Sequence, residues 1–220
     1  CQQASNLEAV LLPDKASAWK AMQKAGVGVA RAIVRDYREL RTVPQSLRVL
    51  ALVGKGNNAG DAIIACGQLL ADYPRASVTL ILSAEVETLK PVAKRAYQQL
   101  EGRVTKHLVQ ASASSADILE LLEDVSGGAG FDVCIDGLLG MSFKPPVRQP
   151  MRALIEAINR YDKIGLRAAV DLPSGRGDES DELTFQADFT YATGVAIKGL
   201  FQGVAECGRV RYIDLGFFNT

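Results

Sequence analysis

Polar side chains that could take part in chemistry gather in three short segments of the sequence. Residues 54–61 read GKGNNAGD, residues 136–148 read DGLLGMSFKPPVR, and residues 171–175 read DLPSG. Each segment begins at the end of an apolar run of the kind that forms a buried strand. Amide and carboxylate oxygens of the sort found there are ligands for a hard cation or a hydroxyl-rich sugar.

The first segment combines two kinds of binding group. An apolar strand at residues 49–53 runs into a turn rich in Gly and Asn, and an amphipathic helix follows. Glycine lets a ligand approach the backbone, and the free N–H groups of a first helical turn attract anions. Asn57, Asn58 and Asp61 add oxygen ligands within five residues. This combination predicts a nucleotide site that also holds an ion.

The elements that must position these segments alternate between extended and helical patterns. Strands are expected at residues 49–53, 77–82, 103–107, 133–136, 166–171, 189–193 and 210–214, and helices at 17–38, 60–70, 86–101, 116–122 and 149–161. Apolar strands separated by helices predict an α/β fold with a doubly wound, mostly parallel sheet. Ligands bind such sheets beyond the carboxyl ends of the strands. The three segments are therefore expected to converge on one cleft.

Each of these polar residues also has a purely structural explanation. Asn57 and Asn58 can form a turn or cap a helix, and Asp136 and Asp171 can cap helices or start turns. The single histidine, His107, has no catalytic partner residue beside it in the sequence. The occurrence of such residues at three strand ends favours a functional site over three unrelated turns.

Composition excludes several classes of protein. The 220 residues suit a single domain, 1–220, with 176–182 as an exposed loop. The 25 basic and 25 acidic residues cancel, which argues against nucleic-acid binding. No apolar run is long enough to span a membrane. Widely spaced cysteines without a CxxC pair predict reduced core thiols and a cytoplasmic location. Cys1, where an initiating Met is usual, suggests that the sequence comes from a longer chain.

Several motifs, in order along nearly the whole chain, resemble those of one family. The segment GKGNNAGDA resembles the GPGNNGGDG turn of the NAD(P)HX epimerases, also called the YjeF N-terminal domain family. AMQKAGVGVARAI resembles that family's helix LMExAGxxxA, DGLLGMSFKPPVRQP its D-A-[IL]-[FL]-G segment, VDLPSG its VDIPSG, and ATGVAIKGL its late T-F-x-x-x-K-x-G-L segment. The resemblance implies a three-layer Rossmann-like fold. It also implies epimerisation of the R and S forms of hydrated NAD(P)H, called NAD(P)HX, in cofactor repair.

The family motifs assign roles to residues of this chain. The resemblance implies that NAD(P)HX would be bound by Asn57, Asn58, Ala59, Gly60, Asp61, Gly140, Met141, Ser142, Phe143, Lys144, Pro145, Pro146 and Asp171. It implies a potassium ion as the cofactor, held by Asn58, Asp136 and Ser174. Opening and closing the hydrated ring needs proton transfer, which a carboxylate can perform. Asp171 is the expected catalytic residue, with Lys198 as the second candidate.

Three departures from the family pattern bear on the site. Lys55 replaces a Pro, and Ala59 and Ala62 replace glycines. Ala59 would be strained if that position required a positive φ, and the added methyl groups could crowd a pyrophosphate. Lys55 could place a charge that competes with potassium. All three ion ligands are kept, which favours a working site.

Two other interpretations remain open at this stage. One is a non-catalytic nucleotide-binding or dimerisation module of the same fold, although the kept ion ligands and Asp171 argue against it. The other is one half of a bifunctional repair enzyme. The resemblance implies a homodimer and a functional link to an ADP/ATP-dependent NAD(P)HX dehydratase, fused or separate. The sequence has no GxGDxLxG-type dehydratase motif, so that activity is not expected from these residues.

Overall fold

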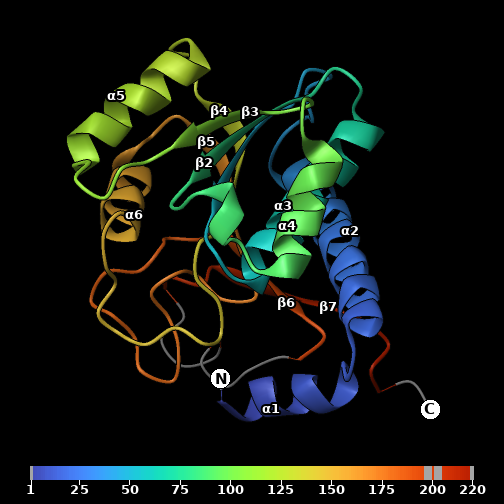
Figure 1. The fold of residues 1–220 in the computed structure, drawn as a ribbon. Coiled ribbons are helices and arrows are strands. Elements are labelled where there is room, and N and C mark those ends of the chain that lie inside the picture. Colours follow the sequence, from blue (N-terminus) through green and yellow to red (C-terminus); the bar gives the residue numbers. More distant parts are fainter. Residues whose placement is uncertain (1, 196–199, 201–204, 219–220) are drawn as a thin grey trace.

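The computed structural model of the protein describes residues 2–195, 200 and 205–218. At its centre is a seven-stranded sheet with the order β3-β2-β1-β4-β5-β6-β7 (Figure 1). Every neighbouring pair is parallel. The strands are β1 (Arg48–Val53), β2 (Ser77–Leu82), β3 (Thr105–Leu108), β4 (Phe131–Gly137), β5 (Ile164–Val170), β6 (Phe189–Thr193) and β7 (Arg209–Ile213). The predicted doubly wound, parallel α/β fold is confirmed.

Helices cover both faces of the sheet and make three layers. The helices are α1 (Gln2–Leu11), α2 (Lys15–Leu40), α3 (Asn57–Asp72), α4 (Pro91–Leu100), α5 (Ser115–Ser126) and α6 (Met151–Arg160). α2, α3 and α4 lie on one face, and α5 and α6 on the other (Figure 1). Alternate residues of β1 enter the two cores: Val49 packs on the α2 side and Leu50 on the α6 side. Burial on both faces is why the strands are continuously apolar.

Several element boundaries differ from the sequence prediction for local reasons. The helix α1 was not predicted. The helix expected at 86–101 is instead a short 3-10 turn, η1 (Val86–Thr88), followed by α4. Pro91 causes the break, because the residue before a proline avoids the helical region and Lys90 accordingly has an extended ψ of 147°. The strand expected at 103–107 starts later, since Arg103 donates its N–H to Leu100 in a turn. The N-cap of α5 is Ser114, two residues before the predicted start of that helix.

The strand order brings the three polar segments together. The chain proceeds from β1 outward to β3 and then returns to place β4 on the other side of β1, so the order reverses between β1 and β4. Directly beyond that point, the Gly54 N–H donates to the Gly137 carbonyl at 3.1 Å. A Cβ at Gly54 would lie 1.9 Å from the Leu138 carbonyl oxygen, so only glycine fits where the chain leaves β1 beside the end of β4. Since β5 lies beside β4, the third segment follows at the same edge.

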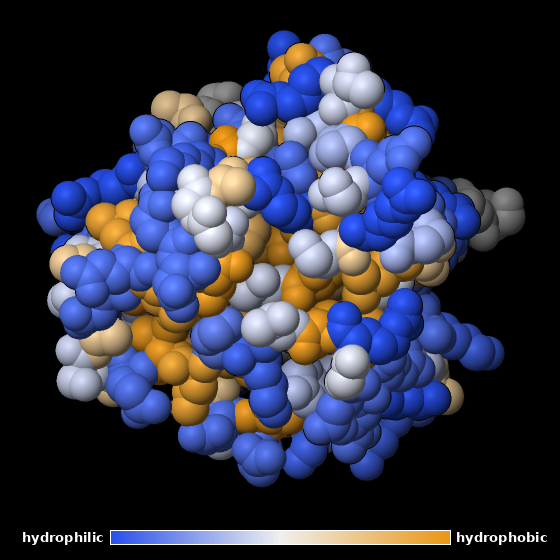
Figure 2. All heavy atoms as spheres, turned by 90° about the horizontal axis from the view of Figure 1, so that it is seen from above, coloured by the Kyte–Doolittle hydropathy of each residue, from blue (hydrophilic) through white to orange (hydrophobic). Residues whose placement is uncertain are grey.

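The opposite end of the molecule, where α2 ends and β1 begins, has a mainly hydrophilic surface (Figure 2). Hydrophilic residues cover most of it, and apolar residues show mainly between them, near the centre and on one side (Figure 2). In the described part of the chain, no helix is both long and apolar enough to cross a membrane.

Candidate active site

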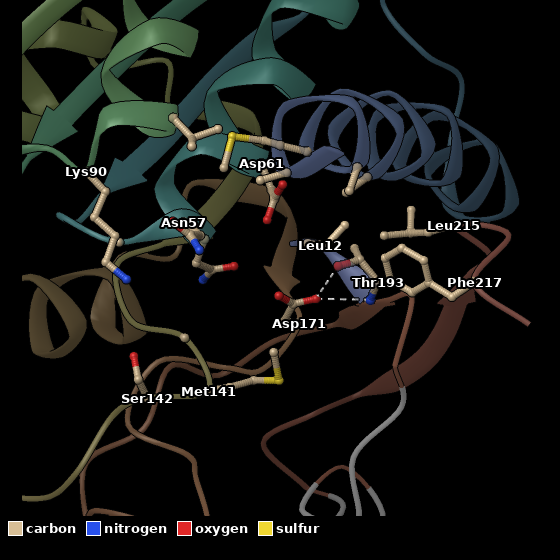
Figure 3. Close-up of a pocket in the computed structure, with 18 residues that line it drawn as sticks. Leu12, Asn57, Asp61, Lys90, Met141, Ser142, Asp171, Thr193, Leu215 and Phe217 are labelled. Atoms are coloured by element: carbon tan, nitrogen blue, oxygen red, sulfur yellow. Dashed lines mark hydrogen bonds between the residues drawn. The ribbon is translucent and has the colours of Figure 1, made fainter. Parts of the chain in front are cut away.

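A cavity of about 220 Å³ opens at the carboxyl edge of the sheet (Figure 3). One side is polar and is formed by the first turn of α3, the loop after β4, and the ends of β5 and β6. The other side is apolar and comes mainly from α2 and from residues near both ends of the chain. The lining consists of Leu12, Ala18, Ala21, Met22, Ala25, Gly56, Asn57, Asn58, Asp61, Lys90, Val92, Gly140, Met141, Ser142, Asp171, Thr193, Leu215 and Phe217.

The first turn of α3 supplies the backbone donors of the polar side. α3 starts at Asn57, three residues earlier than predicted, and its N-cap Gly56 makes no side-chain cap hydrogen bond. The N–H groups of this first turn therefore have no capping side chain, as at helix ends that bind anions. Asn57, Asn58 and Asp61 line the cavity. Figure 3 shows the Asp61 side chain reaching from α3 towards Asp171.

The two alanine replacements do not enter the cavity. Ala59 lies within α3 and is not among the residues with a positive φ, so it is unstrained. The side chains of Ala59 and Ala62 are buried in the core between the helices and the sheet. Gly60 is also buried, and a Cβ there would lie 2.4 Å from the Met22 sulfur. The predicted crowding of a pyrophosphate by these methyl groups is therefore not supported by their positions.

Asn58, Asp136 and Ser174 meet in one hydrogen-bonded network beneath the cavity. The Ser174 hydroxyl donates to Asp136 Oδ1 at 2.6 Å, and the Ser174 N–H donates to Oδ2 at 2.7 Å. The Leu139 N–H donates to the Ser174 hydroxyl at 2.9 Å. The Asn58 amide donates to the Leu139 carbonyl at 2.8 Å. The three strand ends thus converge as their positions in the sequence require.

Two observations bear on whether this network would suit a hard cation. Asn58 Oδ1 is buried and has no hydrogen-bond partner. Buried oxygens of this kind usually accept a hydrogen bond or bind a cation or water. Asp136 is fully buried, and this burial raises its pKa to about 6, despite the hydrogen bonds from Ser174 and Leu138 that lower it. An all-oxygen set with one carboxylate matches the ligand preference of hard ions.

Asp171 has the most unusual backbone of the polar residues at the cavity. Its φ is +59°, the one positive value among the described residues other than glycine. This left-handed conformation costs an aspartate roughly 1–2 kcal/mol, and such strain is common at functional sites. Its Oδ1 accepts hydrogen bonds from the Thr193 N–H at 3.0 Å and the Thr193 hydroxyl at 2.6 Å. Burial raises the pKa of the carboxyl group, and these two bonds oppose that effect.

The remaining predicted residues divide into two groups. Gly140, Met141 and Ser142 line the cavity. Phe143 packs against the core on the α6 side, and the side chains that follow it, Lys144, Pro145 and Pro146, are not part of the lining. Lys55 is exposed and also lies outside the lining. Lys198 falls outside the described residues.

Sequence reasoning missed Thr193 and the apolar side of the cavity. Thr193 ends a strand whose bounds, 189–193, were predicted correctly, so the strand-end rule could have found it. Met22 was visible only as a core position of a helix. Leu12 and Phe217 come from opposite ends of the chain, and no local pattern connects them.

The chain is similar to known proteins over most of its length. Residues 20–199 match the family model described as "YjeF-related protein N-terminus". The chain is 28% identical to an NAD(P)H-hydrate epimerase of Elusimicrobium minutum, over 89% of this chain and 84% of that protein. It is 31% identical to the bifunctional NAD(P)H-hydrate repair enzyme Nnr of Gloeobacter violaceus, over 92% of this chain but 36% of that protein. The crystal structure of the yeast protein ynu0, YNL200c, shares the fold with a TM-score of 0.68 at 22% identity, covering 88% of this chain and 79% of that one.

Proposed function

The chain belongs to the family of YjeF-related N-terminal domains, and on that premise we propose that it is an NAD(P)H-hydrate epimerase. Its substrate is NAD(P)HX, whose R and S forms it interconverts. The observation that carries the proposal is the cavity at the carboxyl edge of the sheet. There the uncapped first turn of α3 and the carboxylate of Asp171, whose backbone is left-handed, line a space with one polar and one apolar side. Relatives named as NAD(P)H-hydrate epimerases support the assignment.

The two sides of the cavity suit the two parts of such a substrate. Phosphate groups fit the free N–H groups of the first turn of α3, because these groups and the helix dipole favour negative charge. Lys90, whose side chain lines the cavity, adds a positive charge near that turn. The apolar side, with Met22 and Phe217, offers a dry surface to a planar ring. Asp171 would then lie at the ring.

The chemistry requires one proton-transfer group. The hydrated carbon of the ring carries a hydroxyl group and is bonded to the ring nitrogen. When a carboxylate takes the hydroxyl proton, a carbonyl forms, the C–N bond breaks, and its electron pair moves to nitrogen. Reclosure on the other face of the carbonyl and return of the proton give the opposite epimer, with no net gain or loss of atoms. Asp171, partly buried and lining the cavity, is the proposed group.

A potassium ion held by Asn58, Asp136 and Ser174 is part of the same proposal. The unpartnered oxygen of Asn58 and the buried carboxyl group of Asp136 support it. When bound, the ion would offset the charge of Asp136 and fix the amide of Asn58 at the cavity. The chain's own residues perform the remaining tasks: the first turn of α3 orients the phosphates, and Asp171 moves the proton.

The wider setting follows from the proposed reaction. Epimerisation converts one epimer into the other. An enzyme that accepts only one epimer can therefore consume both forms of the substrate when the epimerase is present. We propose a functional link to an NAD(P)HX dehydratase, which the bifunctional relative supports. A homodimer and a cytoplasmic location are also proposed. The second rests on the three buried free thiols of Cys66, Cys134 and Cys207.

The test is conversion of the purified R epimer, followed by chromatographic separation of the two forms. We expect conversion by the unmodified protein and a fall in rate of about 100-fold or more in Asp171→Asn, a typical loss for an acid–base group. Asn tolerates a positive φ, so the fold should survive this change. No conversion by the unmodified protein would contradict the proposed function. Normal conversion by the variant would exclude Asp171 as the catalyst.

A further inference from the structure

The end of β6 holds Asp171 by its backbone and by its side chain. The Asp171 N–H donates to the Tyr191 carbonyl at 2.9 Å, just as β5 ends. Two residues further along β6, Thr193 donates both its N–H and its hydroxyl to the side chain of Asp171, at 3.0 and 2.6 Å. These contacts stabilise a residue whose left-handed φ is costly by itself.

Both donors of Thr193 bind the same oxygen. They reach Oδ1, while Oδ2 is the other, cavity-side oxygen of the carboxyl group (Figure 3). An oxygen that accepts two hydrogen bonds has little remaining capacity to accept a proton. The pair of bonds therefore makes the two oxygens of Asp171 unequal.

Thr193 itself is fixed in place. It is 5% exposed, and it pairs with Ile213 of β7 at the end of a strand that is bonded on both sides. A β-branched side chain has few χ1 rotamers, so the hydroxyl group has little freedom to turn away. Among the residues that the structure describes, Asp61 of α3 and Lys90 before α4 are the other charged groups that line the cavity with Asp171.

We propose that Thr193 is a positioning residue for epimerisation: it binds Oδ1 of Asp171 and so leaves Oδ2 as the oxygen that exchanges a proton with the substrate. The inference rests on the proposed function. In the step described above, Oδ2 takes the proton of the substrate hydroxyl group as the C–N bond breaks, and it returns that proton on reclosure. Thr193 keeps its own proton throughout.

The experiment compares two substitutions at position 193. Thr193→Val keeps the shape but removes the hydroxyl group, whereas Thr193→Ser keeps the hydroxyl group. We expect kcat for the R epimer to fall about 10- to 100-fold in the Val variant, as for a misplaced catalytic group, with KM changed less than about threefold. The Ser variant should keep kcat within about threefold of the unmodified protein, because its hydroxyl group can still donate to Oδ1.

Thr190 on the same strand provides the matched control. It is fully buried, and its hydroxyl group donates to the Cys207 carbonyl at 2.7 Å, away from Asp171. Thr190→Val removes a comparable buried hydrogen bond, so it should lower the melting temperature to a similar degree and leave kcat unchanged. Thermal unfolding of all variants shows that each is folded at the assay temperature.

The outcomes separate the two proposals. An active unmodified protein whose Thr193→Val variant keeps a normal kcat overturns the positioning role alone. A Ser variant as slow as the Val variant, or a Thr190→Val variant that loses kcat to the same degree, also overturns it, because the loss then reflects packing. An unmodified protein without epimerase activity overturns the proposed function, and the positioning role with it.

Discussion

Stabilisation by potassium should depend on pH, because the ion and a proton compete for Asp136. In the folded protein, burial raises the pKa of Asp136 from 3.8 to about 6. The folded state therefore binds this proton more tightly than the unfolded state does. Without an ion, the contribution of this group to stability is greatest below about pH 4 and is lost as pH rises through 6. Above pH 6 the buried carboxylate is charged, and that is the form a cation would bind.

The size of the effect can be worked out from this shift. A change from 3.8 to about 6 corresponds to roughly 3 kcal/mol of unfavourable burial of the charged form. A cation at about 100 times its Kd adds about 2.7 kcal/mol to the free energy of unfolding. At pH 5, one unit below the pKa, its apparent affinity falls about tenfold, which leaves about 1.4 kcal/mol. For a protein of this size, the rise in melting temperature is then about 5–10 °C at pH 8 and about half of that at pH 5.

The assay is thermal unfolding at pH 5 and pH 8 in potassium chloride and in tetramethylammonium chloride of equal ionic strength. Subtracting the melting temperatures in the two salts removes the effect of general charge screening, which is the same at equal ionic strength. Asp136→Asn should abolish the difference at both pH values. Asp132→Asn, the same change near the other end of β4, should keep it, because Asp132 bonds to the Arg48 N–H away from the site. A salt difference that is equal at both pH values, or that survives in Asp136→Asn, would refute the reasoning.

Two further substitutions test parts of the site. Ala59→Gly should lower the free energy of unfolding by about 1 kcal/mol, because position 59 is helical and buried. Urea denaturation measures this change. An unchanged free energy of unfolding would contradict a helical first turn at residue 59. Gly194→Ala should raise the KM for NAD(P)HX several-fold with less effect on kcat. Gly194 has a φ of +70°, and the added Cβ would lie 2.5 Å from the Phe217 ring; an unchanged KM would indicate that Phe217 does not contact the substrate.

The sequence predicted the polar half of the site because that half obeys a local rule. In a parallel sheet buried on both faces, strands are continuous apolar runs, so their ends are easy to locate. Asn58 and Asp171 follow such ends, and Asp136 is the second-last residue of β4. The strand order then brings the three residues together. Thr193 obeys the same rule, but threonine is common in strands for its shape alone, so its side chain gave no separate signal.

The apolar half could not be predicted in the same way. Met22 has the helical spacing of any core residue, and only the fold shows that it borders a cavity. Phe217 lies beside Gly194, the residue after β6, and this proximity is a tertiary relation that no local pattern shows. The start of α3 was misplaced because glycine and asparagine usually indicate a turn, whereas here Gly56 alone is the cap and Asn57 already begins the helix.

The close contact between the ends of β1 and β4, at Gly54 and Gly137, makes the floor of the site stiff. A Cβ at Gly137 would lie 2.7 Å from the Ala62 methyl group, so only that methyl group lies between the strand end and α3. The Gly54–Gly137 hydrogen bond ties the two strand ends at the usual spacing of a sheet, about 4.8 Å. Asn58 on α3 and Asp136 on β4 therefore belong to two elements whose backbones are already in close contact. A cation proposed between them would depend on this contact for the distance between its ligands.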